Sequence, residues 1–178
     1  MIGTKELLEL VKKKKLVENL CERELKNPEG SGFDLRIGEA FRFKTFKGFL
    51  GEEDRHTPEV KSFAKYGKEK GIILKPGAYI LMKTIEKVNL PDNVGVIFRP
   101  RTTLYRSGLT LFTGAGSPGY SGELIFAMVN LGGTTVKIEL GARVVHALFY
   151  KTGPNKSNYR GQWVSGRVST QGKKEKQV

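Results

Sequence analysis

Two arginines and two threonines lie close together just after a predicted strand, in the segment Arg101-Thr102-Thr103 followed by Arg106. Guanidinium groups bind phosphate oxygens through paired hydrogen bonds, and neighbouring hydroxyl groups can donate to the same oxygens. This combination is typical of a site for a phosphorylated small molecule. The alternative is a surface turn with solvated arginines, and these four residues alone favour neither interpretation.

A glycine-rich segment follows, from Gly114 through Gly116 and Ser117 to Tyr120. Glycine lets the backbone approach a ligand closely, and free N–H groups in such a turn can donate to an anion or a base edge. The ring of Tyr120 can lie against a sugar, where it would exclude a 2′-hydroxyl group and select deoxyribose. The alternative is a structural β-turn with Tyr120 at the edge of the core, because glycine spacing alone is weak evidence.

The sequence offers few residues for metal binding, nucleophilic catalysis or cysteine chemistry. Asp34, between apolar residues at a strand start, can hold a metal's water ligands or simply cap a turn. His56 and His146 are the only histidines, and no nucleophile elbow accompanies them, which argues against Ser-His-Asp catalysis. Zinc-type ligand spacing is absent and Cys21 is the only cysteine, so we expect neither a zinc deaminase nor an internal disulfide.

The elements that must position these residues are predicted to be mainly β. After Gly71, short β-rich runs alternate with glycine and proline turns, which is typical of a sandwich or barrel of mostly antiparallel strands. Residues 33–49 also predict a strand. The later runs cover residues 72–75, 78–85, 94–99, 109–112, 123–129, 135–140 and 144–150.

The remaining segments predict a single domain with one helix and a mobile end. Leucines at helical spacing predict an N-terminal helix over about residues 4–20, capped by Thr4. The charged segment 51–71 predicts a surface excursion, and the glycine-rich, basic segment 153–178 predicts a flexible tail. Residues 1–152 then form the β domain, a size that suits one hydrophobic core.

The formal net charge of +13 raises the question of a nucleic-acid ligand. Basic and acidic residues are interspersed along much of the chain, and few aromatic residues lie within the basic runs, so platforms for base stacking are not visible. We expect an anionic small molecule instead. Because no long apolar run and no signal-peptide core are present, we expect no membrane contact and a cytoplasmic location.

An ordered series of motifs resembles the trimeric dUTPase and dCTP deaminase superfamily. The matching segments are SGFDLRIG (31–38), LKPGAYILMKTIEKVNLPDN (74–93), RTTLYRSGL (101–109), PGYSGELIFAMVN (118–130), IELGARVVHALF (138–149) and YRGQWVSGR (159–167). The resemblance implies a distorted β-barrel or jelly-roll-like fold, and a homotrimer with active sites at its subunit interfaces. It also implies hydrolysis of dUTP to dUMP and diphosphate, usually with Mg²⁺, or deamination of dCTP without zinc.

The same resemblance implies roles for individual residues. The triphosphate would be bound by Arg101, Thr102, Thr103 and Arg106 of one subunit. Sugar and base would be held by Gly114, Gly116, Ser117 and Tyr120. The tail region that closes over the nucleotide would come from another subunit and would include Arg160, Trp163, Gly166 and Arg167.

Two departures from the superfamily pattern bear on the reaction. Deaminases carry a glutamate, the general acid and base on cytosine, at the position of Ala127, so this chain lacks the group for the central step of deamination. Members also carry an aspartate at the position of Ser117, which orients the attacking water or the sugar hydroxyl. With serine there, another carboxylate would have to position the water, and Glu123 and Asp34 are the nearest in sequence.

The combined expectation is a homotrimeric dUTP diphosphatase with Glu123 and Asp34 as candidate catalytic residues. Mg²⁺ would be bound through the nucleotide phosphates and not by a protein metal site. Two alternatives stay open at this point. They are a catalytically impaired nucleotide-binding relative, which Ser117 suggests, and a dCTP deaminase.

Overall fold

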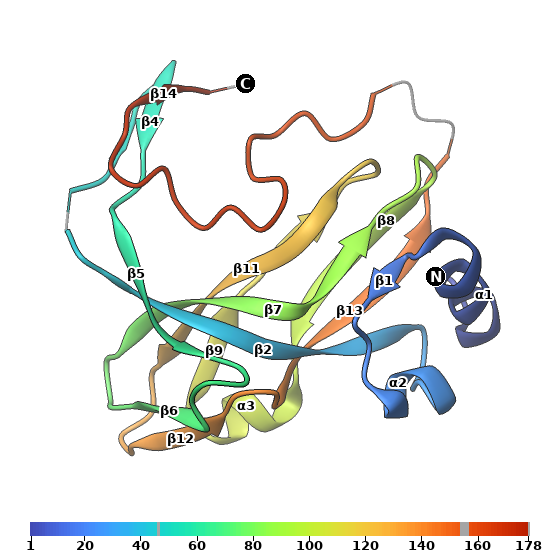
Figure 1. Cartoon of the computed structure of the whole chain (residues 1–178), viewed down its shortest axis with the longest axis horizontal. Coiled ribbons are helices and arrows are strands. Elements are labelled where there is room, and N and C mark those ends of the chain that lie inside the picture. Colours follow the sequence, from blue (N-terminus) through green and yellow to red (C-terminus); the bar gives the residue numbers. More distant parts are fainter. Residues whose placement is uncertain (46, 154–156, 178) are drawn as a thin grey trace.

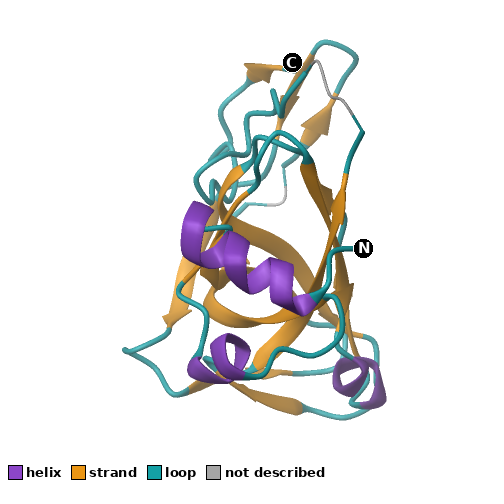
Figure 2. Ribbon diagram, turned by 90° about the vertical axis from the view of Figure 1, so that its right-hand side faces the viewer, coloured by secondary structure: helices purple, strands orange, loops and turns teal. Residues whose placement is uncertain are grey.

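The protein is described here by a computed structural model that covers residues 1–45, 47–153 and 157–177 (Figure 1). A strongly curved sheet forms its body, and short helices lie outside that sheet (Figure 2). The helices are α1 (Thr4–Lys14), α2 (Glu22–Lys26) and α3 (Thr102–Arg106). The strands are β1 (Val17–Glu18), β2 (Gly32–Phe43), β3 (Phe49–Leu50), β4 (Asp54–His56), β5 (Val60–Lys65), β6 (Gly71–Leu74), β7 (Tyr79–Asn89), β8 (Val94–Pro100), β9 (Leu109–Phe112), β10 (Ala115–Gly116), β11 (Ser121–Asn130), β12 (Val136–Glu139), β13 (Arg143–Lys151) and β14 (Glu175–Lys176).

The main sheet is antiparallel and has the order β10-β8-β13-β2-β7-β11-β9, with β1 paired to β7 and β5 paired to β2. Two smaller sheets accompany it, one of β12 and β6 and one of β14, β4 and β3. All the later β-rich runs of the sequence are strands. The prediction of a mainly β, barrel-like fold with an N-terminal helix is therefore confirmed.

Burial follows the period of two that strands impose. Along β7, every second residue from Ile80 to Val88 is buried, including the polar Thr84 and Glu86, and the residues between them are only partly buried. Phe33 and Phe149 are fully buried and meet edge to face, with ring centroids 6.0 Å apart. This packing makes β2, β7 and β13 a rigid platform for the residues at their ends.

The N-terminal helix is shorter than the predicted 4–20. It ends at Lys14 because Lys15 adopts the left-handed conformation, with φ of 52°. Val17 then pairs with Val88 as strand β1, and Leu16 is fully buried. The apolar stripe that suggests one long helix is divided between helix and strand. Gly3, not Thr4, occupies the N-cap position.

Part of the segment expected as a surface excursion, residues 51–71, is a strand of the main sheet. β5 pairs with β2, with Val60 opposite Phe43 and Ala64 opposite Ala40. Val60 and Ala64 are buried, whereas Lys61 is exposed. The loop interpretation is wrong for these residues, because a lysine-rich edge strand has low mean hydropathy even when its inward side chains are apolar.

The described part of the tail, residues 157–177, crosses one end of the sheet and returns beside β4 (Figure 1). There β14 pairs with β4, placing Glu175 opposite Arg55. Ser169 and Thr170 are buried by this arrangement. The flexibility predicted for residues 153–178, and their closure over a nucleotide, stay predictions. Among the described residues, none of the helices has the length and apolar character needed to cross a membrane.

Candidate functional site

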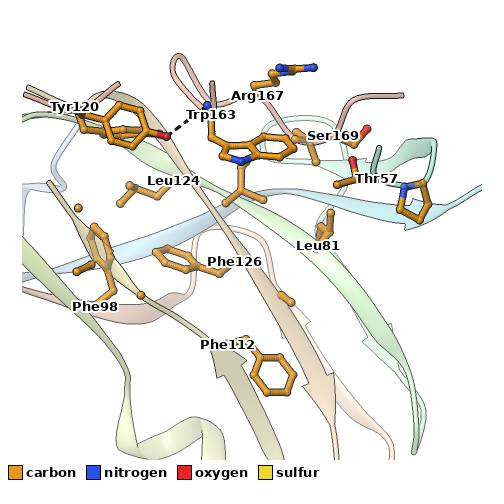
Figure 3. Close-up of a pocket in the computed structure, with 18 of the residues that line it drawn as sticks. Thr57, Leu81, Phe98, Phe112, Tyr120, Leu124, Phe126, Trp163, Arg167 and Ser169 are labelled. Carbon is orange, nitrogen blue, oxygen red and sulfur yellow. Dashed lines mark hydrogen bonds between the residues drawn. The ribbon is translucent and has the colours of Figure 1, made fainter. Parts of the chain in front are cut away.

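A cavity of about 500 Å³ lies between the sheet and the tail (Figure 3). Its walls come from the sheet, from the glycine-rich segment 114–116, from the segment around Thr57 and from the tail. The lining residues are Phe43, Thr57, Pro58, Leu81, Phe98, Phe112, Gly114, Ala115, Gly116, Tyr120, Leu124, Ile125, Phe126, Ala127, Tyr159, Trp163, Arg167, Val168 and Ser169. A concave site of this size with an apolar floor and a few polar groups is typical for a small organic ligand.

A β-bulge in β11 shapes the floor of the cavity. The pairing of β11 with β7 shifts register between Glu123 and Ile125. The N–H group of Leu124 donates to the buried Thr84 hydroxyl at 3.0 Å, so the bulge leaves this donor satisfied. Leu124 and Phe126 line the cavity, and Phe98 meets Phe126 edge to face at 5.2 Å.

Glycines bring backbone close to the cavity where a side chain would not fit. Gly116 is buried in β10, and a Cβ there would lie 2.7 Å from the side chain of Val96. At Gly122, with φ of 152°, a Cβ would lie 2.6 Å from the backbone nitrogen of Ser165 in the tail. Ser165 donates to the carbonyl of Ser121 at 3.0 Å. The PGYSG turn therefore forms the surface on which the tail rests.

Tyr120 is buried and its hydroxyl group is already in use. The hydroxyl donates to the carbonyl of Glu123 at 2.7 Å, and the ring meets Tyr159 edge to face at 5.2 Å. Burial, with smaller contributions from Tyr159 and Glu123, raises the pKa of Tyr120 to about 12. The phenol therefore stays protonated and serves as a wall of the cavity and not as an acid or base.

The tail forms the roof of the cavity. Tyr159 donates its N–H group to the carbonyl of Pro118 at 2.8 Å, and its hydroxyl accepts from the N–H of Trp163 at 3.3 Å. Figure 3 shows the Trp163 ring over the space bounded by Leu124 and Phe126. Five residues of the tail line the cavity, so the tail supplies much of its wall.

A second cluster, of charged residues, surrounds Asp34 at the start of β2. One carboxylate oxygen of Asp34 lies 2.8 Å from Arg101 and 3.0 Å from Arg143, and the other lies 2.8 Å from Nδ1 of His146. The Asp34 side chain is only 7% exposed. Burial tends to raise its pKa, but the His146 hydrogen bond and the charges of Arg101 and Arg143 together lower the pKa below its ordinary value.

Glu24, on α2, extends this cluster inward. Its side chain is 1% exposed, pairs with Arg23 and accepts the backbone N–H of Asp34 at 3.0 Å. Arg143 lies 3.6 Å from the same carboxylate. Two buried carboxylates thus hold three guanidinium groups, those of Arg23, Arg101 and Arg143, at one partly exposed surface.

The predicted site residues fall into separate groups in this single chain. Gly114, Gly116, Tyr120, Trp163 and Arg167 line the cavity, as Ala127 does. Arg101 is joined to Asp34, while Thr102, Thr103 and Arg106 are exposed on α3, at the opposite end of the sheet from the tail (Figure 1). Ser117 and Arg160 are exposed. Gly166 lies against Glu123, because a Cβ there would be 2.6 Å from a Glu123 carboxylate oxygen.

The structure also assembles residues that sequence reasoning does not single out as site residues. Arg143 and His146 reach Asp34 because β13 pairs with β2 in a register that places His146 opposite Asp34. The sequence does carry a signal for His146, a polar residue inside an otherwise apolar strand, whereas Arg143 is the first residue of that strand. Thr57 and Ser169 reach the cavity through a contact between distant segments, for which the sequence carries no local signal.

Within the described ranges, no group of three or more acidic, histidine or cysteine side chains converges in a way that could hold a metal ion. Both oxygens of Asp34 are already bonded, one to Arg101 and Arg143 and the other to His146. Mg²⁺ commonly keeps several waters and binds through substrate phosphates with one or two carboxylates. The side chains present therefore fit an ion that arrives with a nucleotide better than one held in a protein cage.

Comparison with known proteins adds an independent line of observation. Residues 1–152 match the dCTP deaminase-like family. A probable deoxyuridine 5′-triphosphate nucleotidohydrolase of Methanopyrus kandleri is 30% identical over 122 residues, which cover 68% of this chain and 77% of that protein. A dCTP deaminase of Thermococcus kodakarensis is 30% identical over 155 residues, covering 86% and 87%. A dUMP-forming dCTP deaminase of Dictyoglomus turgidum is 26% identical over 164 residues, covering 89% and 84%.

Solved structures agree on the fold. The 2′-deoxycytidine 5′-triphosphate deaminase of Agrobacterium tumefaciens has a TM-score of 0.65 and 13% identity, with 85% of this chain covered. This chain corresponds to 47% of that longer protein. The resemblance to the dUTPase and dCTP deaminase superfamily is confirmed, since the matched relatives are named as one or the other enzyme. The match over residues 1–152 shows that the chain belongs to the dCTP deaminase-like family.

Proposed function

We propose that this protein hydrolyses dUTP to dUMP and diphosphate, with the nucleoside in the cavity beneath the tail. One observation carries the proposal most directly. The glycine-rich segment 114–116, Tyr120 and the tail enclose a space of about 500 Å³. Ala127 lines this space and contributes a methyl group, not a carboxylate. Pockets for small ligands fall roughly between 300 and 1,000 Å³, so a pyrimidine nucleoside is accommodated.

The phosphates would be bound by a neighbouring protomer of a homotrimer. Arg101, Thr102, Thr103 and Arg106 do not line the cavity of their own chain. A site shared between protomers would bring them to the cavity of the next chain. Arg101 is pre-oriented for this role, because Asp34 holds its guanidinium group at 2.8 Å and leaves it 26% exposed.

Of the two candidate catalytic carboxylates, the contacts favour Glu123 for positioning the attacking water. Asp34 has both oxygens bonded, to Arg101 and to His146, and its lowered pKa makes it a weak base. Glu123 lies beside the PGYSG turn and the tail. We assign Asp34 the role of orienting Arg101. Mg²⁺ bound through the phosphates would neutralise charge on the triphosphate.

Deamination of dCTP is the second candidate, because several relatives of this chain are named dCTP deaminases. Ala127 speaks against it. This residue lines the cavity, and a methyl group there cannot shuttle a proton to cytosine. A nucleotide-binding protein without turnover is the third candidate, supported by serine at position 117.

The test is a panel of dUTP, dCTP, UTP and dTTP incubated with the purified full chain and Mg²⁺, with diphosphate and ammonia measured together. We expect diphosphate from dUTP and no ammonia from dCTP. Arg101→Ala should depress this activity. Arg99→Ala, which removes an exposed arginine two residues earlier on β8, serves as the matched control. Ammonia from dCTP would establish the deaminase instead. Thermal stabilisation by dUTP with no product would indicate a binding protein.

A further inference from the structure

The single tryptophan of the chain lies beneath two guanidinium groups. The central carbon of Arg55 lies 4.8 Å from the Trp163 ring centroid, and that of Arg167 lies 5.3 Å from it. Both distances fall within the range of about 6 Å over which cations are attracted to an indole face. Arg167 and Trp163 belong to the tail, but Arg55 comes from β4, more than a hundred residues earlier in the chain.

One carboxylate joins the two arginines. Glu175 accepts from Nε of Arg55 at 3.1 Å and from a terminal nitrogen of Arg167 at 2.6 Å. Arg55 also donates to the side-chain oxygen of Gln162 at 2.7 Å. The side chains of Arg55 and Glu175 are 16% and 17% exposed, so this pair is screened less by water than a surface ion pair would be.

Backbone pairing fixes the same contact. Thr57 and Thr170 bond reciprocally, each N–H donating to the other's hydroxyl, at 2.9 and 2.8 Å. Gly172 donates to the carbonyl of Thr57 at 3.1 Å, and β14 continues the pairing along β4. The tail is therefore docked on its own chain, at the hairpin formed by β3 and β4.

We infer that this hairpin is the receptor for the tail and that Arg55 is a positioning residue for nucleotide binding. A latch that holds the indole over the cavity is formed by Arg55, Gln162, Trp163, Arg167 and Glu175. The inference rests on the proposed function for what the cavity binds, but the latch contacts all lie within the chain, and we expect them to form in nucleotide-free protein. Weakening the latch lowers the fraction of chains in the binding-competent state, so the KM rises while the chemical step is unaffected.

Fluorescence tests the latch directly, because Trp163 is the only tryptophan of the chain. In nucleotide-free protein, Arg55→Ala should raise acrylamide quenching of Trp163 several-fold, and Arg55→Lys should raise it less. With dUTP, Arg55→Ala should raise the KM about tenfold, which corresponds to about 1.4 kcal/mol, and change kcat less than about twofold. Arg42→Ala is the matched control, since it removes a cation 4.1 Å from the Phe63 ring without touching the tail.

Truncation after Gly172 removes Glu175 and β14 but keeps every cavity-lining residue. This second variant tests the latch even if Arg55→Ala does not fold. Quenching equal to wild type in both variants would overturn the latch. Raised quenching with an unchanged KM would overturn its role in nucleotide binding. If no nucleotide is turned over but quenching rises as expected, the latch is supported and the proposed function is refuted.

Discussion

Replacing Asp34 by asparagine removes the negative charge from the centre of the charged cluster. The carboxylate accepts from Arg101 at 2.8 Å, from Arg143 at 3.0 Å and from His146 at 2.8 Å, and it is 7% exposed. An amide keeps one acceptor oxygen but turns an NH₂ group toward either the two arginines or His146. Breaking a buried ion pair on one side costs about 3 to 5 kcal/mol. Because the arginines are partly solvated, we expect about 3 kcal/mol of unfolding free energy to be lost.

The effect of Asp34→Asn should depend on pH in a defined direction. The folded protein lowers the pKa of Asp34 below its value in the unfolded chain. The stabilisation is therefore complete above the unfolded pKa, near 3.9, and is lost as the pH falls through the folded pKa. The difference in stability between wild type and Asp34→Asn should be constant near neutrality and shrink in acid.

Urea unfolding at several pH values and one fixed protein concentration measures this difference. A loss of about 3 kcal/mol corresponds to a fall in Tm of roughly 6 to 12 °C for a chain of this size. Glu9→Gln is the control, because the Glu9–Lys13 pair is exposed and should contribute about 0.5 kcal/mol or less. Equal stability of Asp34→Asn and Glu9→Gln at neutral pH would show that the charged cluster does not stabilise the fold. A difference that grows in acid would contradict the lowered pKa of Asp34.

Three further results are expected. Arg101→Ala should raise the KM for dUTP about 30-fold, or about 2 kcal/mol, through loss of a charged phosphate contact, and steady-state kinetics beside Arg99→Ala would show it. Tyr120→Ala should relax discrimination against UTP, and a ratio of kcat/KM values equal to wild type would assign sugar selection to another residue. Deleting residues 159–178 should leave a folded protein by circular dichroism with reduced turnover, and an undiminished rate would exclude the tail from the site.

The strand pattern is readable from the sequence because β-rich runs alternate with glycine and proline turns. Which face of β7 is buried is not readable, since its buried positions include the polar Thr84 and Glu86. The helix boundary at Lys14 is not readable, since one left-handed residue divides a continuous apolar stripe. Strand β5 is not recognisable from the sequence for a related reason. Its exposed lysines dominate the local composition while Val60 and Ala64 alone carry the burial.

The candidate site divides in the same way. Gly114, Gly116 and Tyr120 can be recognised as candidates from their residue types, and all three line the cavity. The partners of Asp34 depend on strand register, and the contact between Arg55 and the tail joins segments about 120 residues apart. Such long-range pairings follow from tertiary packing, which local propensity and periodicity do not encode.

Mixed assemblies test most directly whether the phosphate-binding residues of one protomer serve the cavity of another. Arg101→Ala damages only the phosphate-binding part of the proposed site, and Ala127→Phe fills only the cavity. Protomers of the two variants can be unfolded, mixed in equal amounts and refolded together. Random assembly then gives about one quarter of the shared sites both an intact Arg101 from one protomer and an intact cavity from the other. We expect recovery of about one quarter of wild-type dUTP turnover. Activity no higher than that of either variant alone would refute a site shared between protomers.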